Sequence, residues 1–449
     1  MDRLDSARRR VNMPDSGRNA TDAFMKKLLA LASAAGVLAA VTGCGVHIST
    51  SSGSWSDADL KAATNLSRTA EIPAGLKNLE VDNPIGAIRI TGTENGPARW
   101  TWKLAVRART EALAQQIALG VNCKTEMEGG RLTLVVSVPD SKEPHSIQSD
   151  FEISAPKSAA VRTQTHFGKT EIAGLGANVE AAAQNGAMEI HNIAGRVRAR
   201  TSFDRMAVSD TGPATLQNQN GEIQAARIGG PLEAATSFAL LRAEDIGGPA
   251  TLANQNGEIK ASAIRGLLDA KTSFASLVAR DIGGRVHLRN QNGSVQVVQA
   301  GGNADIKTSF DKLSVEGIQG DAILVNQNGG VAASGVTGSV QATTSFAAMD
   351  IKGAGSEFVC HNQCGAIRLR ATSTALTHIE ASTSFDTLEL HLPAGLKPAL
   401  LARTSFGDIE SDFPVLMKPR GADPFAEVAP GTLRASLQNQ NGNIRVLGD

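Results

Sequence analysis

One apolar residue recurs every 18 positions along the middle of this chain. The recurring residues are Leu241, Ile259, Leu277, Val295, Leu313, Val331, Met349 and Ile367. A short period sustained over many repeats is typical of solenoids, because one unit cannot bury its apolar face alone and must stack on its neighbours. The period therefore predicts a chain coiled into rungs of about 18 residues rather than a set of globular domains.

The columns beside this one alternate, so the full unit is two rungs. Three positions before the apolar column the residues are Asn220, Phe238, Asn256, Phe274, Asn292, Phe310, Asn328 and Phe346. One rung type reads Thr-Ser-Phe and the other Asn-Gln-Asn-Gly. We expect these residues to form a structural ladder with the phenylalanines packed inside, because alternating large and small side chains fill a stack without clashes. We expect the Asn-Gly pair to supply the positive φ of a sharp corner.

Strand patterns fill the rest of each rung. Residues 222–225 alternate as a half-buried strand should, and a second alternating segment over 232–236 follows a Gly-Gly turn. The predicted fold class is all-β, a single-stranded parallel β-solenoid (β-helix) of about 18-residue rungs with a small mixed N-terminal cap. About 16 such rungs at roughly 4.8 Å would give a rod of about 75 Å.

The composition changes along the chain predict four parts. They are a signal peptide over 1–43, a lipidated cysteine and flexible linker over 44–69, a cap region with first strands and a short helix over 70–154, and β-solenoid repeats over 155–449 with an irregular insertion near 412–431.

An apolar run over residues 28–41 follows two lysines and ends at Val41-Thr42-Gly43-Cys44. This segment resembles a bacterial lipoprotein signal peptide. The resemblance implies cleavage before Cys44 and acylation of that cysteine, which would anchor the protein in a membrane. Since Gly45 follows the cysteine, it also implies an exported outer-membrane or cell-surface lipoprotein, with the periplasmic face as the alternative.

Residues 1–24 add nothing that such a signal peptide needs, which favours a start at Met25 over one at Met1. A twin-arginine signal around Arg8-Arg9-Arg10 is the alternative interpretation of this segment.

The composition also argues against several classes of function. Four per cent aromatic residues, no tyrosine and a formal net charge of zero disfavour a nucleic-acid binder, which needs a basic face. The sequence contains no phosphate-binding loop and no zinc-protease or serine-hydrolase motif. We therefore predict no catalytic residue, no cofactor and no metal.

The segment Cys360-His361-Asn362-Gln363-Cys364 is the one cluster that invites a metal, but its spacing departs from that of paired zinc ligands. We expect two buried thiols in inward columns, with a metal site or a disulfide as the alternatives.

Two groups of carboxylates are candidates for a functional role. Asp204 and Glu222 come from successive rungs, about 5 Å apart along the axis, which is near the separation of a retaining glycosidase pair. A polysaccharide-cleaving β-helix enzyme is therefore an alternative, although a solvated turn explains both residues.

The second group is an acidic stripe formed by Asp210, Asp245, Asp281, Glu316 and Asp350. We interpret it as a solubilising stripe, with calcium bridging as the alternative.

The chain from about residue 75 to 449 resembles the bacterial putative-adhesin family of β-strand-repeat proteins, a domain of unknown function. The resemblance depends on the Asn-Pro-x-Gly-x-Ile opening at 83–88, the helical interruption near 115, the segment at 404–409 and the closing Asn-Gly-Asn-Ile at 441–444. It implies a non-enzymatic adhesin or surface scaffold that binds a glycan or protein ligand along its flank. A periplasmic envelope-stress or regulatory partner is the alternative.

Overall fold

The computed structural model describes residues 45–51, 60, 62–94, 96–353, 355–415 and 432–448. The chain divides into two units, Met1–Thr42 and Gly43–Asp449, and the structure described below belongs to the second. The predicted signal peptide, Cys44 and most of the insertion near 412–431 lie outside the described residues. No helix among the described residues is long and apolar enough to cross a membrane.

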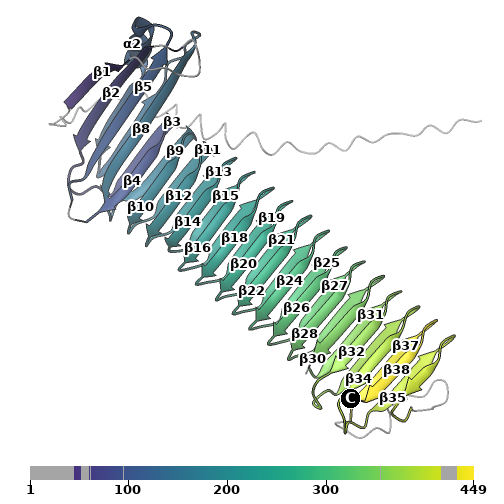
Figure 1. Cartoon of the computed structure of the whole chain (residues 1–449). Coiled ribbons are helices and arrows are strands. Elements are labelled where there is room, and N and C mark those ends of the chain that lie inside the picture. Colours follow the sequence, from purple (N-terminus) through teal and green to yellow (C-terminus); the bar gives the residue numbers. More distant parts are fainter. Residues whose placement is uncertain are drawn as a thin grey trace, which may run out of the picture. The chain divides into compact units, whose positions relative to one another are not determined.

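The repeats form a β-solenoid in which each rung gives one strand to each of two parallel sheets (Figure 1). Strands pair in a register of 18 residues, as in Leu241 with Ile259 and Ile259 with Leu277. This regular spacing continues for about 13 turns, and helix is nearly absent. The predicted fold class is thus confirmed, with two strands in each rung.

The first sheet, called sheet A, contains in its regular part β10 (Thr170–Leu175), β12 (Met188–Ile193), β14 (Met206–Thr211), β16 (Ile223–Ile228), β18 (Leu241–Ile246), β20 (Ile259–Ile264), β22 (Leu277–Ile282), β24 (Val295–Ala300), β26 (Leu313–Ile318), β28 (Val331–Val336), β30 (Met349–Gly353) and β32 (Ile367–Ala371). The second, sheet B, contains β9 (Ala160–Phe167), β11 (Val179–Asn185), β13 (Val197–Thr201), β15 (Ala214–Asn218), β17 (Leu232–Thr236), β19 (Ala250–Asn254), β21 (Leu268–Thr272), β23 (Val286–Asn290), β25 (Ala304–Thr308), β27 (Ala322–Asn326), β29 (Val340–Thr344) and β31 (Glu357–Asn362).

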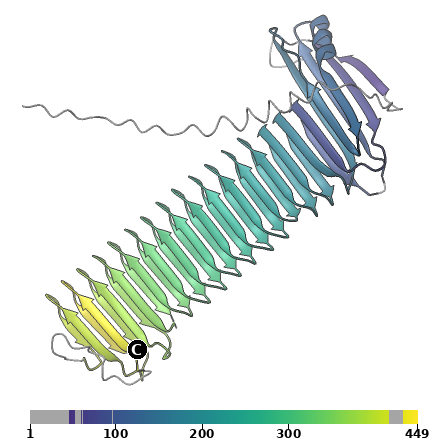
Figure 2. The ribbon, with the colours of Figure 1, turned by 180° about the vertical axis from the view of Figure 1, so that it is seen from behind.

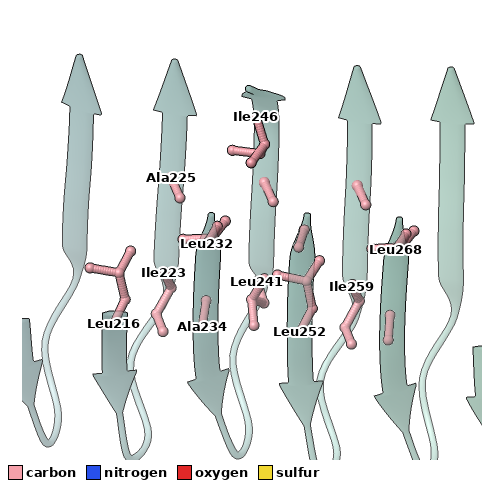
Figure 3. Packing of buried hydrophobic residues seen from close by; sticks show 14 of the residues in the cluster. Leu216, Ile223, Ala225, Leu232, Ala234, Leu241, Ile246, Leu252, Ile259 and Leu268 are labelled. Atoms are coloured by element: carbon pink, nitrogen blue, oxygen red, sulfur yellow. The ribbon is translucent and has the colours of Figure 1, made fainter. Parts of the chain in front are cut away.

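The core is the space between the two sheets, filled by columns of aliphatic side chains (Figure 3). Leu241 and Ile259 of sheet A are fully buried, and Leu252 and Leu268 of sheet B are buried opposite them. Small residues such as Ala243 occupy the next inward positions. Because side chains of a strand alternate between its two faces, the 18-residue period returns the same aliphatic residues to the core in every rung.

Antiparallel strands close the N-terminal end of both sheets (Figure 2). Sheet A continues from β10 through β4 (Ile88–Thr93), β8 (His145–Pro156), β5 (Arg99–Ala108) and β2 (Ala62–Glu71) to β1 (Gly45–Ser51). Sheet B continues from β9 through β3 (Asn78–Ile85) and β7 (Arg131–Ser137) to β6 (Asn122–Glu128).

Among the described residues of this cap, one helix, α2 (Glu111–Gly120), lies at the position where the sequence predicts it. The Thr110 hydroxyl accepts a hydrogen bond from the Leu113 N–H, which caps the first turn. Its residues Ala114, Ile117 and Ala118 are buried.

The segment 44–69, predicted as a flexible linker, contains β1 and most of β2 in the structure. The backbones of β1 and β2 pair antiparallel, with Gly45 opposite Thr69. Strand β2 also pairs along its whole length with β5, and Thr64 and Ala70 are buried there. Serine and threonine are compatible with strands when a neighbouring edge is open, so composition alone misplaced this segment.

The rungs at the C-terminal end are stacked out of chain order. The rung of β33 (His378–Thr383) and β34 (Leu388–Leu392) is followed in space by the last rung of the chain, β37 (Arg434–Asn439) and β38 (Ile444–Gly448) (Figure 1). The rung of β35 (Ala399–Thr404) and β36 (Ile409–Ser411) then pairs with the outer side of that rung.

Candidate functional site

The corner that leads from each sheet B strand to the next sheet A strand carries the alternating motif, and we call it the Phe/Asn corner. Its interior is closed by a column of alternating threonine and asparagine side chains. The buried members include Thr201, Asn218, Thr236, Asn254, Thr272, Asn290, Thr308, Asn326, Thr344, Asn362, Thr383 and Asn439.

These side chains bind the backbone of the neighbouring rung and, for asparagine, of their own corner. Asn254 donates from Nδ2 to the carbonyl oxygen of Ala239 at 2.7 Å and accepts from the Gly257 N–H at 3.0 Å. In the next rung, Thr272 donates from Oγ1 to the Gly257 carbonyl oxygen at 3.0 Å. Each rung type thus satisfies buried backbone groups of the other, which explains why the two types alternate.

The glycine of each Asn-Gly pair is needed for a different reason from the one predicted. Gly257 does not have a positive φ. A Cβ atom there would lie 2.3 Å from the Ala239 carbonyl oxygen, so only glycine lets the two corners stack. The non-glycine residues with positive φ lie at the opposite edge, at Asn192, Asp210, Arg227, Asp245, Ala263, Asp281 and Gln299.

The phenylalanines of the corner point out of the fold. We define the Phe row as Phe167, Phe203, Phe238, Phe274, Phe310, Phe346, Phe385 and Phe406. Seven of these side chains are 56–62% exposed and Phe406 is 81% exposed. The prediction that they pack in the interior is therefore wrong. The reason is that Thr and Asn already close the interior two residues earlier, and the inward-outward alternation of the strand stops at the corner.

The asparagines of the predicted ladder occupy the matching corner positions of the other rungs. Asn220, Asn256, Asn292 and Asn328 are half-buried. Asn292 donates from Nδ2 to the Ser273 carbonyl oxygen of the rung before at 3.1 Å. The buried asparagines that hold the stack together are instead those two positions earlier, such as Asn290.

Rungs that carry phenylalanine alternate with rungs that do not along the whole stack, although the order along the sequence breaks this alternation near the C-terminal end. Along the chain, Phe385 is followed by Phe406 and then by Asn441. Because the last rung stacks between the other two, the spatial order is Phe385, Asn441, Phe406. From Phe167 to Phe406, every phenylalanine rung is separated from the next by one rung that carries asparagine or, once, Cys364.

The spaces between the phenylalanines are polar. Each intervening rung places an exposed glutamine directly before the asparagine or cysteine of the corner: Gln184, Gln219, Gln255, Gln291, Gln327, Gln363 and Gln440. Two rungs span roughly 9.6 Å, so a ring is presented at that interval with amide groups between successive rings. All eight rings are more than half exposed, and such an exposed row is typical of a binding surface.

A shallow groove lies beside the middle of the Phe row, across the outer face of sheet B. Its lining includes Gln255, Ser273, Gln291 and Ser309 from the corners, and Lys271, Arg289 and Lys307 from three consecutive strands. Arg289 is paired with Asp305 at 2.9 Å, and this guanidinium holds the pKa of Asp305 below its ordinary value.

The two carboxylates proposed as a catalytic pair lie at one corner. Asp204 is exposed and accepts a hydrogen bond from the Arg205 N–H at 2.8 Å. Glu222 is half-buried and accepts from Nε2 of Gln224 at 2.6 Å. Neither carboxylate is buried, so their surroundings do not support the catalytic hypothesis.

The acidic stripe is not a single column. Asp210, Asp245 and Asp281 occupy the positive-φ position, whereas Glu316 and Asp350 belong to other columns. Arg227 occupies the rung between those of Asp210 and Asp245 and binds Asp210 through two hydrogen bonds of 2.6 and 2.7 Å. These bonds lower the pKa of Asp210 to about 2. No cluster of three or more His, Cys, Asp or Glu that could hold a metal occurs among the residues that the structure describes.

The cysteine segment is part of the fold. Cys360 is buried in sheet B as a free thiol, and burial raises its pKa to about 12. Cys364 is also free but is only half-buried, because it takes the corner position of an asparagine. The prediction of inward columns therefore holds for Cys360 and is wrong for Cys364.

Comparisons with known proteins give two similar solved structures. A putative cell adhesion protein from Clostridium sporogenes is 8% identical, with a TM-score of 0.16, and the match covers 85% of this chain and 99% of that one. A putative adhesin from Parabacteroides distasonis is 12% identical, with a TM-score of 0.19, and the match covers 66% of this chain and 95% of that one. No protein-family model and no curated protein matches the chain.

Proposed function

We propose that this protein is a non-catalytic, lipid-anchored β-solenoid of the bacterial cell envelope that acts as an adhesin or surface scaffold through its Phe row. The observation that supports this most is the row itself, eight exposed phenylalanines at a fixed two-rung interval along one corner. A solenoid repeats each side chain at constant spacing, so a weak contact made once is made many times and the total affinity grows by multivalency.

The proposed location depends on the sequence around the cysteine. Val41-Thr42-Gly43-Cys44 resembles a lipoprotein cleavage site, and acylation of Cys44 by two or three chains would anchor the protein stably. The resemblance to the putative-adhesin family is compatible with an exported outer-membrane or cell-surface protein. Its ligand would be a glycan or a protein bound along the solenoid flank.

Adhesion is tested with bacteria that display the full chain, or its variants, at equal surface amounts. We expect the quadruple substitution of Phe238, Phe274, Phe310 and Phe346 by Ala to reduce attachment to cells and matrix at least 10-fold. The matched control replaces Leu267 and Ile323, which are exposed apolar residues outside the Phe row, by Ala. Equal attachment by the quadruple variant and the control would exclude the Phe row as the adhesive surface.

The anchor is tested separately. Cells labelled with a radioactive fatty acid should incorporate it into the chain, and Cys44→Ser should abolish incorporation and release the protein from the membrane. Incorporation unchanged in Cys44→Ser would contradict the proposed anchor.

A periplasmic protein-binding role is the second candidate, and the open end of the solenoid favours it. Among the described strands, β36 pairs only with β38, and Ile409 of β36 is exposed. Such an edge can accept a strand from a partner. Protease treatment of intact cells separates the two candidates, because a periplasmic protein stays protected while a surface adhesin is cut.

A further inference from the structure

The chemistry of the Phe row and of the spaces between its rings points to a particular class of ligand. We infer that the row binds an extended, β-1,4-linked glycan lying along the solenoid axis, with alternate sugars stacked on phenylalanines and the intervening sugars bound by glutamine and asparagine amides. This inference rests on the proposed adhesive function of the same row and specifies its ligand.

The first argument is the interval between rings. Successive rungs of a parallel sheet are about 4.8 Å apart, so rings in every second rung recur at roughly 9.6 Å. In an extended β-1,4-linked glycan each sugar is turned over relative to the next, and the same face recurs with every disaccharide. The length of that disaccharide is close to two rungs. Because the disaccharide is slightly longer than two rungs, every second sugar can present its apolar C–H face to a new phenylalanine over a run of a few rings.

The second argument is the polarity of the gaps. The rung between Phe274 and Phe310 presents the exposed Gln291 and the half-buried Asn292. Asn292 uses Nδ2 to bind the Ser273 carbonyl oxygen, and its Oδ1 remains available to accept a hydrogen bond. Amides placed between aromatic surfaces are the donors and acceptors that sugar hydroxyls require.

These amides also argue against a second copy of this chain as the occupant. Two Phe rows could interdigitate, since the rings and the gaps have the same interval. Each inserted ring would then cover a glutamine such as Gln291 without offering it a hydrogen bond, and removing amide groups from water without a partner is costly. Sugar hydroxyls supply those partners.

The third argument is that the alternation continues to the end of the stack. Phe385 and Phe406 are consecutive phenylalanine rungs in the sequence, yet Asn441 lies between them in space. Rings and amides therefore keep the same interval from Phe167 to the terminal rung, as an extended polymer with a regular repeat would require.

The experiment is titration calorimetry of the full chain with β-1,4-linked oligomers of N-acetylglucosamine and of glucose, from two to eight sugars. Oligomers of α-1,4-linked glucose, which curve away from a straight axis, are the ligand control. We expect affinity to rise roughly 2- to 10-fold for each two sugars added and little for each odd sugar, because only every second sugar reaches a new ring. The α-linked oligomers should not bind.

Variants separate the parts of the inference. Substitution of Phe238, Phe274, Phe310 and Phe346 by Ala leaves two separated pairs of exposed rings, one at each end of the row. Affinity should then stop rising beyond about four sugars, because no longer oligomer reaches a third ring. The Leu267→Ala and Ile323→Ala control should keep the full dependence on length. Gln255→Ala combined with Gln291→Ala should weaken binding by several-fold while the two-sugar step remains. Thermal unfolding of each variant confirms that the solenoid is intact.

Each outcome decides between the hypotheses. Stepwise β-linked binding that requires the Phe row supports both the ligand and the adhesive role. If the quadruple variant loses attachment to cells but no glycan binds the unsubstituted chain, the row is adhesive and the glycan inference is overturned. A dimer that becomes monomeric in the quadruple variant would identify a second copy as the occupant. If the quadruple variant changes neither attachment nor glycan binding, both proposals are wrong.

Discussion

Asn439 donates a hydrogen bond from Nδ2 to the carbonyl oxygen of Asp386 at 2.6 Å, across 53 residues of sequence. In the regular repeats the same bond joins residues 15 apart, as in Asn254 to Ala239. The last rung, β37 and β38, also accepts a hydrogen bond on its other side: Thr404 donates from Oγ1 to the Gly442 carbonyl oxygen at 3.1 Å. The out-of-order rung thus repeats the asparagine and threonine contacts of the rest of the stack.

This stacking predicts the effect of removing the last rung. Deletion of the chain from residue 432 onward should leave β35 and β36 without the strands with which they pair. Stacking directly on β33 and β34 would place one threonine rung on another, so Thr404 would lose the glycine carbonyl of an asparagine rung. We expect amides of residues 399–411 to lose their protection from hydrogen exchange, while those of β18 to β30 keep theirs. Retained protection in 399–411 would show that two phenylalanine rungs can stack on each other.

The exposure of the Phe row predicts that its residues contribute little to stability. Phe274→Ala should change the free energy of unfolding by less than about 1 kcal/mol, because most of the ring is already in water. Leu277→Ala, three residues later and fully buried, should cost about 2–5 kcal/mol through lost burial and the cavity left behind. Urea unfolding of both variants measures the difference. If Phe274→Ala lowers the free energy of unfolding as much as Leu277→Ala does, the Phe274 ring must be packed in the core.

The two asparagines of one corner should differ in the same way. Asn254→Ala removes the partner of the Ala239 carbonyl and of the Gly257 N–H, and should cost about 1–3 kcal/mol. Asn256→Ala, in the same turn but half-buried, should cost less than about 1 kcal/mol. The difference in urea midpoint measures this, and equal losses would mean that the buried hydrogen bonds do not hold the corners together.

The cap and the first regular rung share a cluster of charges that predicts a pH dependence. Glu171 binds Arg89 of β4 and Lys169, and these contacts lower the pKa of Glu171 to about 2 from an ordinary 4.5. Because the pKa is lower in the folded protein than in the unfolded one, the stabilisation is present above about pH 4.5. It is lost as pH falls from there towards 2.

The measurement is the melting temperature as a function of pH. Glu171→Gln should lower the melting temperature at pH 6 and should reduce the further fall between pH 5 and pH 3. Glu233→Gln, at an exposed strand position, is the control and should follow the unsubstituted protein. Identical pH profiles for Glu171→Gln and the unsubstituted chain would show that these charge pairs do not couple the cap to the solenoid.

Much of the fold follows from the sequence because its period is imposed by stacking. The column from Leu241 to Ile367 recurs every 18 residues, since each rung must bury the same face, and the strand register follows it. The helix at Glu111–Gly120 was also predictable, because Thr110 caps an apolar segment. The linker was not, since the Ser/Thr-rich residues of β1 and β2 become strands only when the open edge of β5 accepts them.

The residues of the Phe/Asn corner could be predicted from the sequence, but not whether their side chains point into the core or into water. The alternation of Phe and Asn at one corner follows from the amino-acid order alone, because equivalent positions of a repeat can be aligned directly. The tertiary structure decided that Phe274 faces water, since Thr272 already fills the interior of that corner. It also decided that Asn441 separates Phe385 from Phe406, because the hydrogen bonds of Asn439 and Thr404 form when the last rung stacks between two earlier ones.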